Sequence, residues 1–380
     1  MMKKSLVAVA LASVALASAV NAKTVVYDKD GTSMYLDGRV MAVWYNTGAS
    51  NSNAGDGDST IINSGRFGIG ASSPIGNTGI NAIGYMQWDV SDGDKKGDNG
   101  FKSRDQYVGV DGGKWGKVIV GKYRDSLRYV TEVTDIYETW GQNATYVGEE
   151  RRAGQIQYTW KGSGFTVEVG YQAAKDDTNT RFSDDFDYVE SGGNIAVGYD
   201  VPGTNGVGDV FHGPLSIRAG FGYYAMQDPN EGGGKYGDEA TEWAFSATWG
   251  NVSKGLYLSL MYNAVYLGYN ERGENSGYDD TTYQGLEFVI GYGFENGIKV
   301  LTGYSWLKMD TDSTSGDLAD YDGETAGVIP LFIDWQLNPK FDVWIEGLFA
   351  VDADGHSCDW ASIGNIHDQQ AVGVGARYNF

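Results

Sequence analysis

Histidine, cysteine and neighbouring acids build most hydrolytic and metal sites, and this chain has few of the first two. Its histidines and its single cysteine are His212, His356, Cys358 and His367. His367 and Asp368 are neighbours of the types that activate water in a hydrolase. Taken together, His356, Cys358, Asp359 and His367 contain the donor atoms of a metal site. Because no second acid pair and no known ligand spacing accompany them, we expect no catalytic residue, no cofactor and no metal.

The chain is strongly acidic, with 50 Asp and Glu against 28 Lys and Arg and a net charge of −22. Phosphate binding needs clustered Lys and Arg, so we expect no nucleic-acid partner. An acidic balance suits either simple solubility or a surface that attracts cations. One cysteine permits no intrachain disulfide, so stability must come from backbone pairing and packing.

The residues from Ala371 to Phe380 show the clearest pattern of secondary structure. Val372, Val374, Ala376, Tyr378 and Phe380 alternate with Gly373, Gly375, Arg377 and Asn379. A strand with one apolar face and one small or polar face fits a barrel whose outside meets lipid and whose lumen is wet. In a bilayer every backbone group must find its partner within a closed sheet. The pattern therefore predicts the last strand of an outer-membrane barrel.

The first residues are typical of a secretory signal peptide. Lys3 and Lys4 precede an apolar run from Leu6 to Val20, and small residues lead to a cleavage site after Ala22. We therefore expect residues 1–22 to be removed and residues 23–380 to form one domain. That domain contains no apolar run long enough for a spanning helix, so it must cross a membrane by strands.

Alternating segments recur along the whole chain. In Phe165 to Gln172, for example, every second residue is apolar. The short connectors between such segments are Gly112 to Trp115, Lys161 to Gly164, Asn251 to Lys254, Phe294 to Gly297 and Asn338 to Lys340. The long polar ones are Thr47 to Ser59, Asp92 to Gly100, Asp176 to Tyr188, Asp228 to Asp238, Tyr269 to Thr281, Asp310 to Glu324 and Asp354 to His367. This asymmetry predicts an all-β, antiparallel transmembrane barrel of about sixteen strands, which is wide enough for an aqueous channel.

A soluble propeller or β-helix is the alternative all-β architecture. Either would repeat a motif at a fixed period, and the chain contains no such repeat. Its 56 Gly, 26 Tyr and 11 Trp with only 6 Pro also favour a barrel, in which aromatics form interfacial girdles.

The longest connector, Arg124 to Glu149, differs from the others because it is partly apolar. Its apolar members are Leu127, Tyr129, Val130, Val133, Ile136, Tyr137 and Trp140. A connector with so much apolar surface should pack against something. In a wide barrel the inner wall is the nearest surface, so we expect this third external loop to fold into the channel.

At this point the chain resembles the general porins of Gram-negative outer membranes. The resemblance is carried by Tyr27-Asp28-Lys29-Asp30-Gly31-Thr32, Leu36-Asp37-Gly38-Arg39, Gly84-Tyr85-Met86-Gln87-Trp88 and the terminal Ala376-Arg377-Tyr378-Asn379-Phe380. The infolded loop matches as Thr134-Asp135-Ile136-Tyr137-Glu138-Thr139-Trp140-Gly141, without the proline and paired glycines of the commonest version.

The resemblance implies a charged constriction in which loop acids face a basic cluster on the opposite wall. The implied acids are Asp135 and Glu138, and the implied bases are Arg39, Arg66, Arg104 and Arg151. It also implies that the terminal aromatics Tyr378 and Phe380 are an assembly signal.

Strand alternation gives an independent test of the arginines. Arg39, Arg66 and Arg151 each share a face with polar or small residues, so they should point into the lumen. The assignment of Arg104 to the lumen has a consequence for its neighbour. If Arg104 points into the lumen, Asp105 lies on the opposite face with Phe101 and Tyr107, which lipid or a neighbouring subunit should cover. Arg152, by the same alternation, should be a rim residue.

We therefore expect a general diffusion porin that passes ions and small hydrophilic solutes with a weak preference for cations. The resemblance implies a homotrimer in contact with outer-membrane lipid, lipopolysaccharide and the barrel-insertion machinery. Two alternatives stay open: a substrate-specific sugar or oligosaccharide channel, and an outer-membrane hydrolase. A run of aromatics on lumenal faces would indicate the first, whereas most Trp lie near strand ends or on outward faces.

Overall fold

Strands form nearly all of the regular structure in the computed structural model, which describes residues 23–46, 60–91, 100–148, 151–175, 188–226, 237–270, 279–312, 322–353 and 370–380. The strands are β1 Thr24–Lys29, β2 Thr32–Asn46, β3 Thr60–Pro74, β4 Asn81–Ser91, β5 Phe101–Asp111, β6 Lys117–Arg124, β7 Arg151–Gly162, β8 Phe165–Gln172, β9 Val189–Val201, β10 Leu215–Met226, β11 Gly237–Asn251, β12 Lys254–Tyr269, β13 Thr281–Gly293, β14 Ile298–Thr311, β15 Thr325–Asn338, β16 Phe341–Ala353 and β17 Gln370–Asn379. One α-helical turn, α1 Arg128–Thr131, and two 3-10 turns, Gly113–Trp115 and Val207–Asp209, accompany them. None of the helices in these residues is long and apolar enough to cross a membrane.

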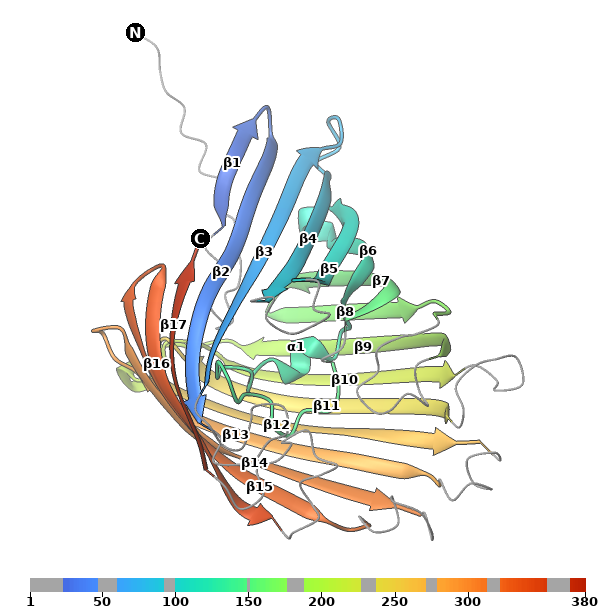
Figure 1. Cartoon of the computed structure of the whole chain (residues 1–380). Coiled ribbons are helices and arrows are strands. Elements are labelled where there is room, and N and C mark those ends of the chain that lie inside the picture. The colour runs from blue at the N-terminus through green and yellow to red at the C-terminus, as the bar shows by residue number, and fades with distance from the viewer. Residues whose placement is uncertain are drawn as a thin grey trace.

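The sheet closes on itself. Every strand from β2 to β17 pairs antiparallel with the next, including β9 with β10, and β17 pairs back onto β2. These sixteen strands form the barrel seen in Figure 1, and β1 is an additional strand paired with β2. The predicted fold class, an antiparallel barrel of about sixteen strands, is confirmed.

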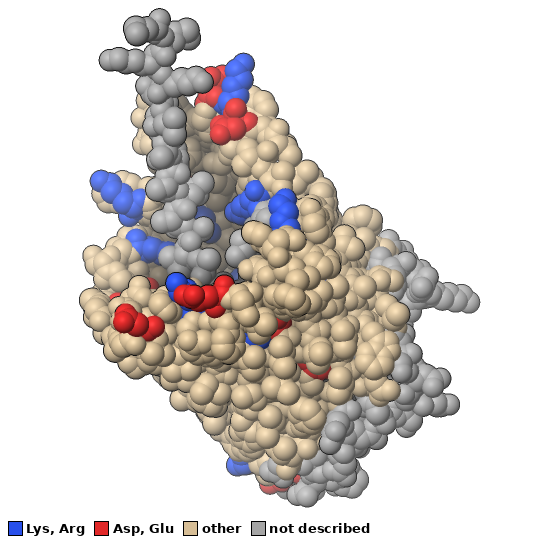
Figure 2. All heavy atoms as spheres, turned by 90° about the vertical axis from the view of Figure 1, so that its left-hand side faces the viewer, with Lys and Arg blue, Asp and Glu red and all other residues tan. Residues whose placement is uncertain are grey.

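The two faces of the barrel differ as a lipid-facing wall requires. On β17 the side chains of Val372, Val374 and Tyr378 are 38–48% exposed, whereas Arg377 and Asn379, which point inward, are each 4% exposed. In Figure 2 charged side chains gather around the hollow and at the rims, and the wall between them is mainly uncharged. An apolar exterior and a polar interior are what a transmembrane barrel needs.

The short connectors lie where the sequence predicts them. Strand β7 ends at Gly162 and β8 begins at Phe165, and the turns after β11 and β15 are equally tight. Four residues separate β13 from β14. His212 lies in the longer turn between β9 and β10. The strand ends on the opposite side of the sheet are linked by the long polar connectors, most of whose residues lie outside the described ranges.

The first and last strands share one edge of β2, an arrangement that the sequence did not indicate. Strand β17 pairs with residues 39–46 of β2, and β1 pairs with residues 32–36. Between them, Gly38 N–H donates to the Phe380 carbonyl (3.1 Å) and Phe380 N–H donates to the Gly38 carbonyl (3.0 Å). The last residue of the chain is therefore part of the closing ladder.

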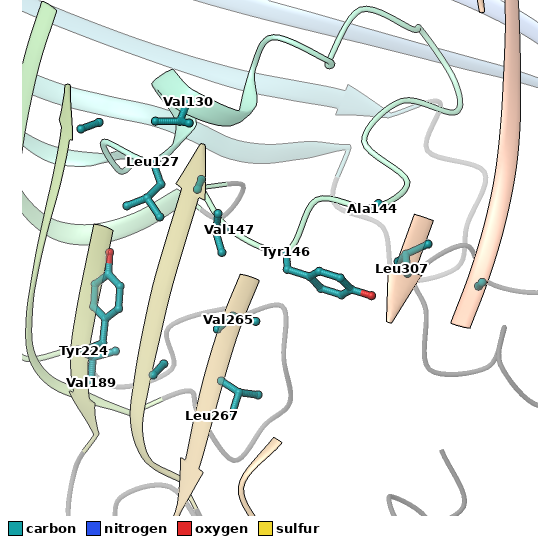
Figure 3. Close-up of a cluster of buried hydrophobic side chains, with 14 of the residues drawn as sticks. Leu127, Val130, Ala144, Tyr146, Val147, Val189, Tyr224, Val265, Leu267 and Leu307 are labelled. Atoms are coloured by element: carbon teal, nitrogen blue, oxygen red, sulfur yellow. The ribbon is translucent and has the colours of Figure 1, made fainter. Parts of the chain in front are cut away.

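The connector after β6 folds into the barrel, as predicted. Figure 1 places α1 within the ring of strands. The apolar residues Leu127 and Val130 of this connector are fully buried. Together with Val147 they pack toward Tyr224 and Val265 of the wall (Figure 3). The hydrophobic interior of this barrel is therefore built between one loop and the inner face of the sheet. This infolded loop comprises residues 125–148.

Candidate functional site

Carboxylates on the inner wall hold the infolded loop by its backbone. The Glu346 carboxylate of β16 accepts hydrogen bonds from the N–H groups of Thr139 (2.8 Å) and Trp140 (2.7 Å). The Glu287 carboxylate of β13 accepts another from the Ala144 N–H (2.7 Å). Glu346 and Glu287 are 0% and 2% exposed. Because each buried carboxylate needs these donors, the path of the loop is specified by the wall.

Two further contacts hold the rest of the loop against the same side of the barrel. Asn263 of β12 accepts from the Tyr146 N–H (2.7 Å) and donates to the Ala144 carbonyl (2.7 Å). Arg218 of β10 donates to the Tyr129 carbonyl (2.5 Å) and forms an ion pair with Glu132 (3.2 Å). The loop therefore covers the inner faces of β10, β12 and β13 and reaches β16.

Arg152 contradicts the expectation of a rim residue. It is 4% exposed and forms ion pairs with Asp125 at the start of the loop and with Glu242 (3.9 Å). The cause is a β-bulge in β7, where Ala153 and Gly154 together lie opposite the single residue Lys122 of β6. Gly154 has φ +80°, which glycine adopts without strain. The extra residue breaks the strict alternation of β7, so Arg152 points inward, as its neighbour Arg151 also does where it binds Asp105.

The four predicted arginines lie together on the inner wall, on β2, β3, β5 and β7. Arg39 and Arg66 are direct cross-strand neighbours. Arg66 and Arg104 both bind Asp89 of β4, at 3.2 Å and 2.5 Å. Arg151 lies close enough to interact electrostatically with Arg104 and Arg66. We call Arg39, Arg66, Arg104 and Arg151 the arginine wall.

A second bulge explains how Arg104 and Asp105 can both face the lumen. Between the pairs Met86–Gln106 and Trp88–Ser103, one residue of β4 opposes two of β5, namely Arg104 and Asp105. The Asp105 carboxylate accepts a hydrogen bond from Arg151 Nε (2.6 Å). The expectation that Asp105 and Tyr107 share a lipid-facing side with Phe101 is therefore wrong. Phe101 is 62% exposed, and the bulge reverses the alternation between it and Asp105, so Asp105 and Tyr107 both face the lumen.

The structure brings one of the two predicted acids to the arginine wall. Glu138 lies 3.6 Å from Arg39 and also pairs with Arg377 of β17. Asp135 instead pairs with Arg128 of its own loop. The loop therefore meets the wall through Glu138, and the charge of Asp135 is compensated within the loop.

Arg377 and Asp342 belong to the same charged cluster and were not singled out from the sequence. Arg377 lies between Glu138 and Asp342, the latter at 2.8 Å. The alternation in the last strand does carry a signal, because Arg377 lies on the face opposite Tyr378. Only the folded loop reveals its partner.

Within the part of the chain that the structure describes, no three His, Cys, Asp or Glu side chains form a group that could hold a metal. The candidate residues His356, Cys358, Asp359, His367 and Asp368 lie outside the described residues. Fixed charges of both signs line a lumen that one loop narrows.

A closed barrel with an apolar exterior, a charged interior and an infolded loop is the architecture of a transmembrane pore. A family model described as Gram-negative porin matches residues 5–380. The chain belongs to this family and is located in the outer membrane. This membership points to a channel rather than an enzyme.

The relatives are distant in sequence. Outer membrane protein F of Serratia marcescens is 24% identical over 403 residues, covering 100% of both chains. Outer membrane protein U of Vibrio vulnificus is 24% identical over 233 residues, and the match spans 60% of this chain and 63% of that protein. The chain thus matches less than two thirds of the length of this second relative.

Solved structures share the fold. Salmonella typhi OmpF, in a complex with daunomycin, superposes with a TM-score of 0.71 at 17% identity, covering 94% of this chain and 100% of that one. An anion-selective porin from Comamonas acidovorans superposes with a TM-score of 0.66 at 17% identity, covering 92% and 100%.

Proposed function

We propose that this protein is a general diffusion porin that passes ions and small hydrophilic solutes without chemical change. One observation carries the proposal: the infolded loop meets the charged inner wall through Glu138, at Arg39 and Arg377. Charged side chains on an inner wall require a wet lumen, because burying them without water or a partner is costly. A barrel of this strand number is wide enough for an aqueous channel.

We propose a weak preference for cations. The connectors outside the described residues, beyond residue 46, contain 21 Asp and Glu but only 5 Lys and Arg. Acidic entrances concentrate cations before they reach the constriction. The arginine wall acts in the opposite direction, so the net preference is small.

We further propose a homotrimer that contacts outer-membrane lipid and lipopolysaccharide and is inserted by the barrel-assembly machinery. Small outward residues on β4, Ala82 and Gly84, support a subunit contact because lipid would favour larger side chains. Residues 1–22 are proposed to be a removed signal peptide, and Tyr378 and Phe380 an assembly signal. No observation on the described residues favours the hydrolase alternative.

Liposomes that contain the purified protein should swell in isotonic solutions of neutral sugars at rates that fall steeply with sugar size. A pentose should enter fastest, a trisaccharide slowly and a dextran not at all, because the loop narrows the lumen. When an impermeant osmolyte keeps the solution isotonic, the rate should rise linearly with the concentration of the permeating sugar. Protein-free liposomes are the control. Swelling that saturates for one sugar and is absent for the others would favour the sugar-specific alternative instead.

A further inference from the structure

Three tyrosines lie side by side on the inner wall, on β2, β4 and β5, and two of these strands, β2 and β5, also carry members of the arginine wall. Tyr85 of β4 and Tyr107 of β5 are direct cross-strand neighbours, and their ring centroids are 5.7 Å apart. Tyr35 of β2 is stacked on Tyr85, at 6.2 Å and an interplanar angle of 23°. Tyr123 of β6 continues the series edge-on, 6.1 Å from Tyr107. We call Tyr35, Tyr85 and Tyr107 the tyrosine row.

Glycine on the intervening strand makes the row continuous. Gly70 of β3 lies directly between Tyr35 and Tyr85 in the register. A Cβ atom on Gly70 would lie 2.1 Å from Tyr35 Cζ. The Tyr35 ring therefore lies across β3 toward Tyr85. All three rings of the row are half-buried, so part of each faces the lumen.

Hydrogen bonds connect the row directly to the arginine wall. Tyr85 OH donates to Asp37 (2.9 Å) and accepts from Gln87 Nε2 (2.7 Å). The other atom of the same amide, Gln87 Oε1, accepts from Arg104 Nε (3.1 Å). One amide group thus separates a tyrosine from a guanidinium. Both are held in fixed positions by these contacts.

The charges on this wall suit an anionic group. Asp89 is shared by two guanidinium groups, those of Arg66 and Arg104. Asp37, the acid nearest the tyrosines, is 2% exposed and is bound by Tyr85 and Gln87. Asp89 and Asp105 are the part-exposed carboxylates of this wall, with side chains 38% and 25% exposed. A solute in the lumen therefore meets four guanidinium groups against two carboxylates on the wall itself.

We propose that the tyrosine row and the arginine wall form a binding path for small organic acids whose carboxylate is attached to a six-membered ring. The ring face would lie on the tyrosines, which stack with flat apolar surfaces. The carboxylate would accept hydrogen bonds from Arg104 and its neighbours, whose planar guanidinium groups match carboxylate geometry. Acidic sugars and aromatic acids share this chemistry. Lumenal aromatics are also the feature expected of a sugar-specific channel. The proposal deepens the proposed channel function and rests on it.

The test compares four solutes on the unaltered channel in a planar bilayer carrying KCl current. Glucuronate and benzoate have both a ring and a carboxylate, gluconate has a carboxylate on an open chain, and glucose has a ring without charge. Glucuronate, benzoate or both should interrupt the current in resolved events, with longer events than gluconate or glucose give. Interruption by glucuronate alone assigns the path to acidic sugars, and interruption by benzoate alone assigns it to aromatic acids.

Variants then locate the effect. Tyr35→Leu and Tyr107→Leu, made singly and together, should shorten the events by roughly three- to tenfold, as expected for loss of an aromatic contact. The matched control is Tyr171→Leu, because Tyr171 of β8 is 51% exposed on the outside. The four-solute comparison needs no variant, so it holds even if the double variant does not fold.

Four outcomes would overturn the proposal. Equal events with gluconate, glucuronate and benzoate would show that charge alone is recognised, and equal shortening in Tyr171→Leu would remove the row from the path. A conducting channel that none of the four solutes interrupts would overturn the binding path and leave the porin function intact. Absence of any KCl current would overturn the porin function itself, and the binding path with it.

Discussion

Replacing Glu138 with Gln should shift the reversal potential in a KCl gradient toward anions by several millivolts. Glu138 is the acid through which the loop meets the wall, at Arg39 (3.6 Å) and Arg377. Unit charges about 4 Å apart interact by about 4 kcal/mol at an effective dielectric near 20, several times thermal energy. Removing that negative charge leaves two guanidinium groups less compensated where the lumen is narrowed. Anions should then pass more easily and cations less easily.

The matched control is Asp135→Asn on the same loop. Asp135 pairs with Arg128 within the loop rather than with the wall, so this substitution should change the reversal potential much less. Both variants remove one carboxylate, so a difference between their shifts in reversal potential reports the position of the lost charge and not the change in net charge. Equal shifts in the two variants, or no shift in Glu138→Gln, would discard the assignment of Glu138 to the conduction path.

Deleting Phe380 should sharply lower the amount of folded protein in the outer membrane while leaving export across the inner membrane intact. Phe380 makes two backbone hydrogen bonds with Gly38 where the barrel closes. Its ring packs so closely on Gly38 that a Cβ there would lie 2.5 Å from Phe380 Cζ. Two lost hydrogen bonds cost about 2 kcal/mol, roughly thirtyfold in a folding equilibrium. Loss of the proposed assembly signal should add to this.

The measurement is the amount of heat-modifiable trimer on an SDS gel, with and without boiling. Phe380→Trp is the control, because it keeps the backbone contacts and the terminal aromatic and should retain most of the trimer. A normal trimer band in the deletion variant would refute the role of Phe380. Monomer alone in unboiled samples of the unaltered protein would refute the trimer.

Strand alternation carries most of what could be predicted from the sequence. A strand has a period of two, so Val372, Val374 and Tyr378 are assigned to the lipid face and Arg377 to the lumen without knowing their neighbours. The infolded loop was predictable for a similar reason, because residues such as Leu127 and Val130 need an apolar surface to cover them. These predictions depend only on local chemistry.

The remaining features depend on how strands are aligned with one another. Each bulge inserts one residue and reverses the alternation beyond it, which is why Asp105 and Arg152 were assigned to the wrong places. Gly154 is a local signal for one bulge, and nothing in the sequence around Arg104 marks the other. The tyrosine row was missed because Tyr35, Tyr85 and Tyr107 are neighbours only in the folded register.

The current through single channels of the unaltered protein, recorded across KCl gradients, tests the central claim most directly. A wet lumen with fixed charges predicts steady, ohmic steps and a small cation preference. That preference should grow as KCl falls from about 1 M to about 0.1 M, because the Debye length rises from about 3 Å to about 10 Å and screening weakens. No conductance steps, or a preference unaffected by salt, would contradict a water-filled channel with charged entrances.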